Sequence, residues 1–522
     1  MRINKKFTIL FSVIAITSAS CKKSFLQEKP YSFVSSEALY NTDAGLEAAV
    51  NGCYSIMADY GGYGAGYLTW MTVGSGGYYT TQAPNNDMNT MTHTSSNLWL
   101  INNSPWDQFY SAIKVANDII ANAPKGTASV IAKQNAIGEA HFMRGMLYFN
   151  LVRMFGGVPL RITPPTQDDV NMPRATKDEV YLLVISDLQK AKTMMSALPV
   201  TGRPSKWAAS ALLGKVYLTL AGNQTAVQTP YWQKAKDELL SVVTNGGYVL
   251  HSSFVNLFTA GNENTKESII EIQYSISGGP NGQFTNFFCP NGSTLTPKAQ
   301  NGPFGRNRLN KDIFDRHRSQ YSVDPRIDVS YLYGSFTRNV GGTTSIYPAV
   351  NNATQGWPYV KKYSDPDYVA TFSNRNFIYL RFADVLLMLA EAENEISGPT
   401  NAYQYVNQVL TRARNSATPA AAQPANWTGM TQDQFRDRIM RERRYELIGE
   451  GHLWHDVRRR GAAYLKAFFI EHNTHSTFNA TADRRYPTDD ASVNKLLLIP
   501  IPEKEINANT MINPEHQNPG YN

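Results

Sequence analysis

Cysteine is scarce in this sequence. Only three cysteines occur among 522 residues, at positions 21, 53 and 289. Their spacing matches neither a zinc site nor a disulfide framework, which excludes a fold held together by either. Cys53 and Cys289 could still pair with each other in an oxidising compartment, and the sequence leaves that question open.

Long hydrophobic runs are also missing. The apolar stretch FTILFSVIAI at residues 7–16 has ten residues, whereas a helix that crosses a bilayer needs roughly 20. No later stretch qualifies either. We therefore expect a chain without a transmembrane helix.

The sequence lacks a basic stripe of the kind that binds nucleic acid, although its formal net charge is +7. The densest basic cluster lies at residues 441–460, where four acidic side chains are interleaved with the arginines. This spacing indicates ion pairs rather than a phosphate-binding face. We expect no nucleic-acid partner.

Signatures of catalysis are absent as well. No G-x-S-x-G, Walker A or dinucleotide-binding pattern occurs. Glu391 and Glu395 share a helix face, but glycosidase carboxylates face each other across a substrate, so an ion-paired face is favoured. His452 and His455 form H-x-x-H beside Asp456 without the glutamate of a zinc-protease motif. We predict a protein that is not an enzyme and holds no metal or cofactor.

The first twenty residues are typical of a secretory signal. A positively charged start precedes the apolar run, and the small residues Ser18, Ala19 and Ser20 come directly before Cys21. We predict that residues 1–20 are a lipoprotein signal peptide, that Cys21 carries the lipid anchor, and that residues 21–30 form a lipidated tether. The alternative is an ordinary signal peptide cut near an unrelated cysteine.

The remaining chain alternates between stretches with helical periodicity and loops rich in Gly, Asn, Thr and Ser. The apolar residues of these stretches recur every three to four positions. The stretches lie at about 106–120, 143–154, 205–221, 382–396, 402–414 and 432–448. Because they come in pairs, we predict a mostly α fold of degenerate tetratricopeptide-like helix pairs, with long irregular loop insertions and minor β-structure.

The irregular insertions lie at residues 60–105, 275–308 and 334–376, and loops this long usually carry function. The first is dense in aromatic rings and asparagines. A sugar rests its C–H face on a flat ring and pairs its hydroxyls with amides, so we predict a sugar-binding surface there. The candidate ligand-binding residues are Tyr67, Trp70, Tyr78, Tyr79, Asp87, Trp99 and Asn102, with Phe284 and Phe287 for an opposite wall. The alternatives are core packing for each ring and a turn cap for Asp87.

Ten segments in order resemble the SusD/RagB family. They are FLQEKP (25–30), WDQFYSAIKVANDII (106–120), GEAHFMRGMLYFNLVRMFGGVPL (138–160), RPSKWAASALLGKVYL (203–218), IIEIQYS (269–275), FIYLRFADVLLMLAEAEN (377–394), VNQVLTRAR (406–414), RERRYELIGEGHLWHDVRRRG (441–461), LLLIPIP (496–502) and QNPGY (517–521). The chain departs from the family at His452, where arginine is frequent, and at Lys22 and Lys23, where acidic residues often follow the cysteine.

The resemblance implies a glycan-binding lipoprotein at the surface of the outer membrane, which captures oligosaccharide and delivers it to a SusC-type TonB-dependent transporter. It implies one SusD-like unit over residues 31–522, with an N-terminal part at 31–222 that contains the glycan-loop region 60–105, and a C-terminal part at 268–522. It also favours Trp99 and Asn102 as ligand-binding residues, because their Trp-x-x-Asn spacing resembles that of the aromatic and amide residues that contact sugar in glycan-binding members. A peptide-capturing member and a surface glycoside hydrolase are the alternatives.

Overall fold

The computed structural model describes most of the chain after the predicted tether. The described residues are 36–82, 86–166, 171–198, 200–222, 229–275, 277, 279–299, 302–369 and 371–521. The predicted signal peptide, Cys21 and the tether lie outside them. Within the described ranges, every helix is too short or too polar to cross a lipid bilayer.

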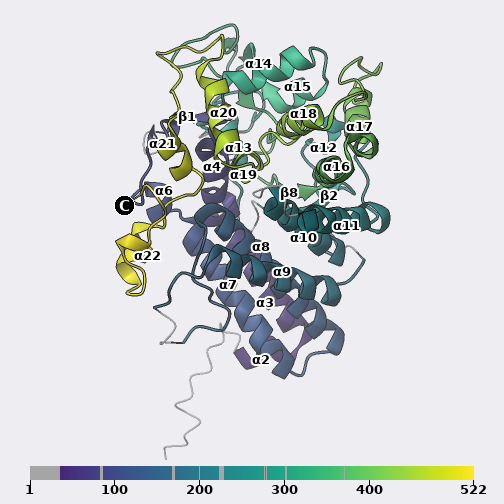
Figure 1. Ribbon diagram of the computed structural model, residues 1–522, viewed down its shortest axis with the longest axis vertical. Coiled ribbons are helices and arrows are strands. Elements are labelled where there is room, and N and C mark those ends of the chain that lie inside the picture. The colour runs from purple at the N-terminus through teal and green to yellow at the C-terminus, as the bar shows by residue number, and fades with distance from the viewer. Residues whose placement is uncertain are drawn as a thin grey trace, which may run out of the picture.

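Helices dominate the described chain and pack as consecutive pairs (Figure 1). The pairs are α8 (Val130–Phe155) with α9 (Lys177–Met194), α10 (Lys206–Gly222) with α11 (Thr229–Asn245), and α16 (Phe382–Ser397) with α17 (Pro399–Asn415). Neighbouring pairs meet where α9 contacts α10 and α11 contacts α16. Two further helices, α3 (Asp43–Ala58) and α7 (Pro105–Asn122), pack beside α8. Each predicted helical stretch therefore lies within or over an observed helix.

Local sequence explains where these helices begin and how closely they approach. Thr176 caps α9 in a capping box: its hydroxyl oxygen accepts from the Glu179 backbone amide, and the Glu179 carboxylate accepts from the Thr176 backbone amide. Thr431 and Gln434 form the same motif at the start of α18 (Gln432–Glu446). In α10, a side-chain carbon at Gly214 would lie 2.7 Å from Leu239 of α11. Only glycine allows these two helices to pack this tightly.

Strands are few and short, and every pairing is antiparallel. One sheet has the order β1 (Tyr78–Thr80), β3 (Asn307–Leu309), β7 (Tyr359–Val360) and β4 (Tyr331–Leu332). A second consists of β2 (Ser268–Ile272) and β8 (Phe377–Arg381), and a hairpin joins β5 (Ser335–Thr337) to β6 (Thr343–Ser345). The first sheet pairs Tyr78 with Leu309. It thus connects the loop region 60–105 to a segment more than 200 residues away in sequence.

The region 60–105 contains more regular structure than its composition indicates. It forms the π-helix η2 (Tyr60–Gly64), α4 (Gly66–Thr72), the 3-10 turn η3 (Val73–Ser75), β1, α5 (Asn86–Asn89) and α6 (Leu98–Ile101). A side chain at Gly66 would lie 2.2 Å from the carbonyl oxygen of Gly61. The glycines that suggest an irregular loop therefore serve close backbone packing instead.

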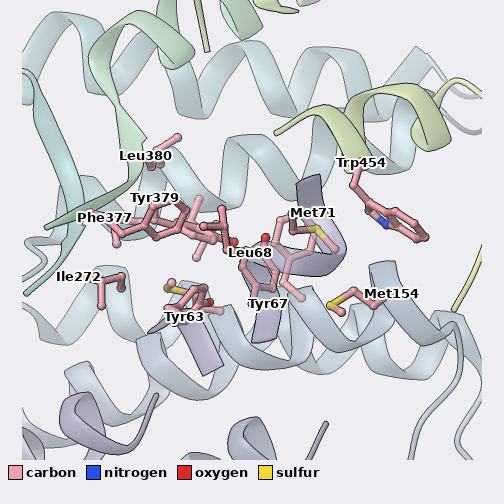
Figure 2. Close-up of a cluster of buried hydrophobic side chains, with 14 of the residues drawn as sticks. Tyr63, Tyr67, Leu68, Met71, Met154, Ile272, Phe377, Tyr379, Leu380 and Trp454 are labelled. Atoms are coloured by element: carbon pink, nitrogen blue, oxygen red, sulfur yellow. The ribbon is translucent and has the colours of Figure 1, made fainter. Parts of the chain in front are cut away.

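A large hydrophobic core contains residues from both ends of the described chain, from Tyr40 to Ile501. Figure 2 shows part of it, where the Tyr63 ring packs against both Tyr67 and Tyr379. The ring centroids of these pairs are 5.0 Å and 5.6 Å apart. This packing removes α4 aromatics from solvent.

A second buried region is made of charges, and we call it the buried ion-pair core. Its members are Glu267, Asp324, Arg326, Lys362, Arg381, Arg412, Glu442, Glu446 and Glu450. Arg381 is central, with contacts of 2.8, 2.7 and 2.7 Å to three carboxylates. The neighbouring arginines hold the pKa of Glu446 well below its usual range, despite burial. The prediction of ion pairs at residues 441–460 is confirmed.

Both described cysteines are free thiols. Cys53 donates to the Ala112 carbonyl at 3.3 Å, and Cys289 lies 3.7 Å from the Tyr363 carbonyl. Burial raises the pKa of each thiol to about 12. The open question of a Cys53–Cys289 bond is therefore answered: the two do not pair.

Candidate functional site

Large apolar side chains stand exposed on loops and short helices around α13 (Phe284–Phe288). We call this region the aromatic loop surface. Its exposed members are Tyr60, Leu98, Phe304 and Phe372, which are 38%, 45%, 41% and 40% exposed. Side chains of this kind cost free energy when left in water, so a cluster of them marks a binding surface.

Tyr60 and Trp99 form a stacked pair at this surface. Their ring centroids are 6.0 Å apart and their planes differ by 13°. Trp99 is only 3% exposed and also meets Phe287 edge-on at 6.1 Å. Trp99 therefore supports the exposed Tyr60 ring from below, and Tyr60 presents the outer face.

The helix α6 fixes the position of Trp99. The Asn97 side chain caps α6 by accepting from the Trp99 amide at 2.9 Å. The Asp87 carboxylate accepts from the same Asn97 amide group at 2.8 Å and 3.1 Å. Asp87 thus holds the residue that caps α6, as the turn-cap alternative predicts. Asn102 follows at the end of α6 with an exposed side chain.

Hydrogen bonds from α13 tie the other loops to this pair. The Asn286 carbonyl accepts from the Phe304 amide at 2.9 Å, and its side-chain oxygen accepts from the Tyr368 hydroxyl at 3.1 Å. Gln283 donates to the Thr371 carbonyl at 3.3 Å, next to Phe372. The loops that carry Phe304 and Phe372 are therefore anchored to the same short helix.

One positive charge lies among these rings. The Arg306 guanidinium sits 4.4 Å from the centre of the Phe304 ring. Burial raises the pKa of Tyr60, and the positive charge of Arg306 opposes that rise. The surface therefore combines flat apolar rings with a hydrogen-bond donor and the Asn102 amide.

Tyr79 lies on a neighbouring stack. Its ring lies 4.1 Å from that of Trp357, with planes 6° apart. Arg308 approaches Tyr359 at 4.9 Å beside this stack. Tyr79 is half-buried, so one part of its ring stays open to solvent.

Five of the other candidate rings are enclosed, which corrects the expectation that they face a ligand. Tyr67 hydrogen-bonds to the buried His455 at 2.9 Å, and Trp70 packs edge-on against His93 at 5.0 Å. The Tyr78 hydroxyl accepts from the Gly449 amide at 2.9 Å. The rings of Tyr67, Trp70, Tyr78, Phe284 and Phe287 are at most 2% exposed. Their apolar area is used by the core, which is the packing alternative.

Trp99 was expected in a loop and lies in α6, and the sequence patterns did not single out the four exposed members of the surface. These are Tyr60, Leu98, Phe304 and Phe372, together with the adjacent Arg306. Phe304 stands in the motif GPFGR, where flanking glycines leave its ring little to pack against. That local pattern is the one signal that could have singled it out.

The carboxylates that imitate an acid–base pair are engaged in ion pairs. Glu391 binds Arg459 through two contacts of 2.7 Å. Glu395 binds Arg436 at 2.6 Å and 2.7 Å. The prediction of an ion-paired face is confirmed.

The histidine pair lies in the core. His452 accepts from the Lys215 ammonium at 2.9 Å, and burial, followed by the Lys215 charge, lowers its pKa to about 3. In the part of the chain that the structure describes, no three His, Cys, Asp or Glu side chains are grouped to hold a metal ion.

Two family models match this chain. The one described as the SusD family covers residues 244–521, which is more than half of the sequence. The chain belongs to the SusD family. A second model, described as starch-binding associating with outer membrane, covers residues 24–218.

Relatives of the SusD type align over most of this chain. SusD-like protein P2 of Formosa agariphila is 29% identical over 99% of this chain and 100% of its own length. A SusD-like protein of Bacteroides ovatus is 27% identical over 88% of this chain and 83% of its own.

Solved structures share the fold of this SusD-family chain. A SusD homolog from Bacteroides thetaiotaomicron has a TM-score of 0.76 at 23% identity, and the match covers 93% of this chain and 98% of that one. Another, solved with xylogluco-oligosaccharide, has a TM-score of 0.71 at 22% identity and covers 90% and 98%. The predicted family and the predicted mostly helical fold class are confirmed.

Proposed function

We propose that this protein captures an oligosaccharide on the aromatic loop surface while Cys21 anchors it by lipid to the outer face of the outer membrane. It then passes the glycan to a SusC-type TonB-dependent transporter. Membership of the SusD family supports each part of this role, and the related structure with bound xylogluco-oligosaccharide supports the ligand class.

The observation that carries the proposal is the exposed Tyr60 ring, stacked on Trp99, with Arg306 against Phe304 and the exposed Asn102 at the end of α6. A ring that covers roughly 100 Å² of sugar surface, at about 25 cal/mol per Å², stabilises the complex by up to about 2.5 kcal/mol before association costs. The amide and guanidinium groups supply directional contacts to hydroxyls. Affinity in the micromolar to millimolar range is expected, which allows release to a transporter.

The test is titration of Tyr60→Ala with xylogluco-oligosaccharide and a panel of other glycans. We expect affinity for the bound glycan to fall at least about tenfold, the equivalent of ~1.4 kcal/mol. Tyr231→Ala is a matched control, because Tyr231 is also a partly exposed ring stacked on one neighbour, Tyr217, at 6.1 Å. Equal affinity of both variants and the wild type would place the site elsewhere.

The anchor and the partner have separate tests. Cys21→Ala should move the protein from the membrane fraction to the soluble fraction, because acyl chains are the proposed attachment. Mild-detergent purification of the wild type should recover a TonB-dependent transporter with it. Recovery of the protein alone at native expression levels would contradict the hand-over step.

The two alternatives give different readouts in the same preparations. A glycoside hydrolase would release new reducing ends from the polysaccharide, whereas a capture protein leaves their number unchanged. A peptide-capturing member would leave every glycan in the panel unbound.

A further inference from the structure

A cavity of about 440 Å³ lies apart from the aromatic loop surface, with which it shares no lining residue. This volume is within the range of small-ligand sites. Tyr54 and Ser55 of α3 and Phe142 and Met146 of α8 line it, and so do residues 268–273. The last segment is β2 with the residue that follows it.

The cavity meets a free edge of β2. Among the described residues the sheet has only two strands, β2 and β8, so one edge of β2 has no strand beside it. Successive side chains of a strand point to opposite faces. Because residues 268–273 all line the cavity, its wall is the strand edge rather than one face. A free edge presents backbone donors and acceptors to any extended chain.

Neighbouring segments cover this edge at both ends and leave its middle open. At one end the Val249 amide donates to the Lys266 carbonyl at 3.2 Å. At the other end Gly202 lies against the Gln273 side chain. At that same end the side-chain amide of Gln273 donates to the backbone carbonyl of Glu271 at 2.8 Å, a contact that a neighbouring strand would otherwise supply. At about 3.3 Å per residue, the gap accommodates about four residues of an extended chain.

The charges around the gap favour one direction for a bound chain relative to β2. Arg203, at the Gly202 end, is already paired with Glu139 at 2.7 Å and with Glu47. Lys266, at the start of β2, is exposed and forms no ion pair with a described residue. A chain antiparallel to β2 would end beside Lys266, so its C-terminal carboxylate would meet this free ammonium group.

We propose that this cavity binds a short extended peptide, which adds to β2 as a third, antiparallel strand with its C-terminal carboxylate beside Lys266. Main-chain hydrogen bonds to the β2 edge provide affinity, and the accessible apolar lining at Val200 and Tyr248 favours an apolar peptide side chain. A sugar fits less well, because Arg203 covers one face of the Tyr54 ring at 5.2 Å from its centre. The site is independent of glycan capture.

The probe is the tetrapeptide acetyl-Thr-Val-Thr-Val with a free carboxylate. We expect saturable binding to the full mature protein by calorimetry, and slower amide hydrogen exchange in residues 268–273. The same peptide with proline at its second position loses a main-chain donor and should bind at least about fivefold more weakly. No saturable binding at millimolar peptide overturns the proposal.

Variants locate the peptide. Ser55→Trp fills the cavity from the exposed side of α3 and should lower peptide affinity at least about tenfold. Ala48→Trp, two turns earlier on an exposed part of α3 that does not line this cavity, is the control and should bind like the wild type. Lys266→Met should weaken the free-acid peptide and leave the C-terminally amidated peptide unchanged.

Glycan titration of the same variants separates this proposal from the proposed function. Ser55→Trp should bind oligosaccharide like the wild type, which also shows that it is folded, and Tyr60→Ala should bind the peptide like the wild type. Wild-type peptide affinity in Ser55→Trp, or loss of glycan binding in that variant alone, overturns the peptide site.

Discussion

On the aromatic loop surface, Tyr60 keeps 38% of its area exposed above the buried Trp99, and the Arg306 guanidinium lies against the Phe304 ring. In the buried ion-pair core, Arg381 is fully enclosed by three carboxylates. The first region leaves contacts unmade that a ligand can complete. The second pairs its charges with one another inside the protein, so substitutions in the buried ion-pair core should lower stability and substitutions on the aromatic loop surface should lower ligand affinity.

The largest expected effect is on the stability of the buried ion-pair core. Arg381→Met leaves Glu267, Glu446 and Glu450 short of a partner without exposing them to water. Breaking a buried pair in this way costs about 3–5 kcal/mol. Urea denaturation should show the loss as a lower midpoint.

Arg436→Met is the matched control for that change. Arg436 also binds a carboxylate through two contacts, but its side chain is 27% exposed. We expect a loss of no more than about 1 kcal/mol. Equal losses in the two variants would remove the distinction between internal and surface charge.

Trp99→Ala should affect both properties, because Trp99 is buried and also supports Tyr60. Removal of a buried tryptophan costs about 3 kcal/mol of unfolding free energy, and the unsupported Tyr60 ring should lower glycan affinity about tenfold. Tyr60→Ala should lower affinity to a similar extent and cost less than about 1 kcal/mol of stability. A stability loss in Tyr60→Ala as large as that in Trp99→Ala would show that the surface is part of the core.

Acid should destabilise the protein first through buried histidines. Burial lowers the pKa of His93 and His452 to about 3 and that of His455 well below its usual value, whereas His472 beside Asp312 shifts upward. A lowered folded-state pKa gives stability that is present above the unfolded pKa of about 6.5 and is lost as pH falls toward 3.

For His452 alone this loss is about 2 kcal/mol at pH 5. Denaturation midpoints measured between pH 7.5 and 5 should therefore fall, and less steeply in His452→Gln. A flat profile in the wild type would contradict the buried neutral state of these rings. The arginine-paired carboxylates, Glu446 among them, should add a second loss only below about pH 4, where their unfolded forms take up protons.

The smallest effect is expected for Asn102→Ala. Its exposed amide has no packing role, so the unfolding free energy should change by less than about 0.5 kcal/mol. Loss of one hydrogen bond to a sugar hydroxyl should lower affinity about threefold to tenfold. Calorimetric titration of Asn102→Ala and Tyr60→Ala with the same glycan compares how much the amide and the ring each contribute to the binding free energy.

Sequence predicted the helical part of the fold well because amphipathic spacing is a local signal. The stripe at Trp106–Ile120 became α7, and the IIEIQYS segment became β2. Burial in the region 60–105 could not be predicted in the same way. Whether Tyr67 or Tyr60 is exposed depends on contacts such as that of Tyr67 with His455, which is nearly 400 residues away.

The aromatic loop surface therefore includes only some of the residues that the sequence predicted for a ligand site. Trp99 and Asn102 do lie at the aromatic loop surface, whereas Trp70 and Tyr78 are core residues. Phe304 and Phe372 come from other loops, and only the α13 hydrogen bonds bring them to Tyr60. No local pattern encodes that convergence.

The two buried thiols make this protein convenient for site-directed labelling. Cys53 and Cys289 are inaccessible, and burial raises the pKa of each to about 12, so neither forms a reactive thiolate at neutral pH. In a form that lacks residues 1–21, a single new cysteine would therefore be the only site for a maleimide dye. Val340, which is 93% exposed at the tip of the β5–β6 hairpin, offers such a position without a change to the native thiols.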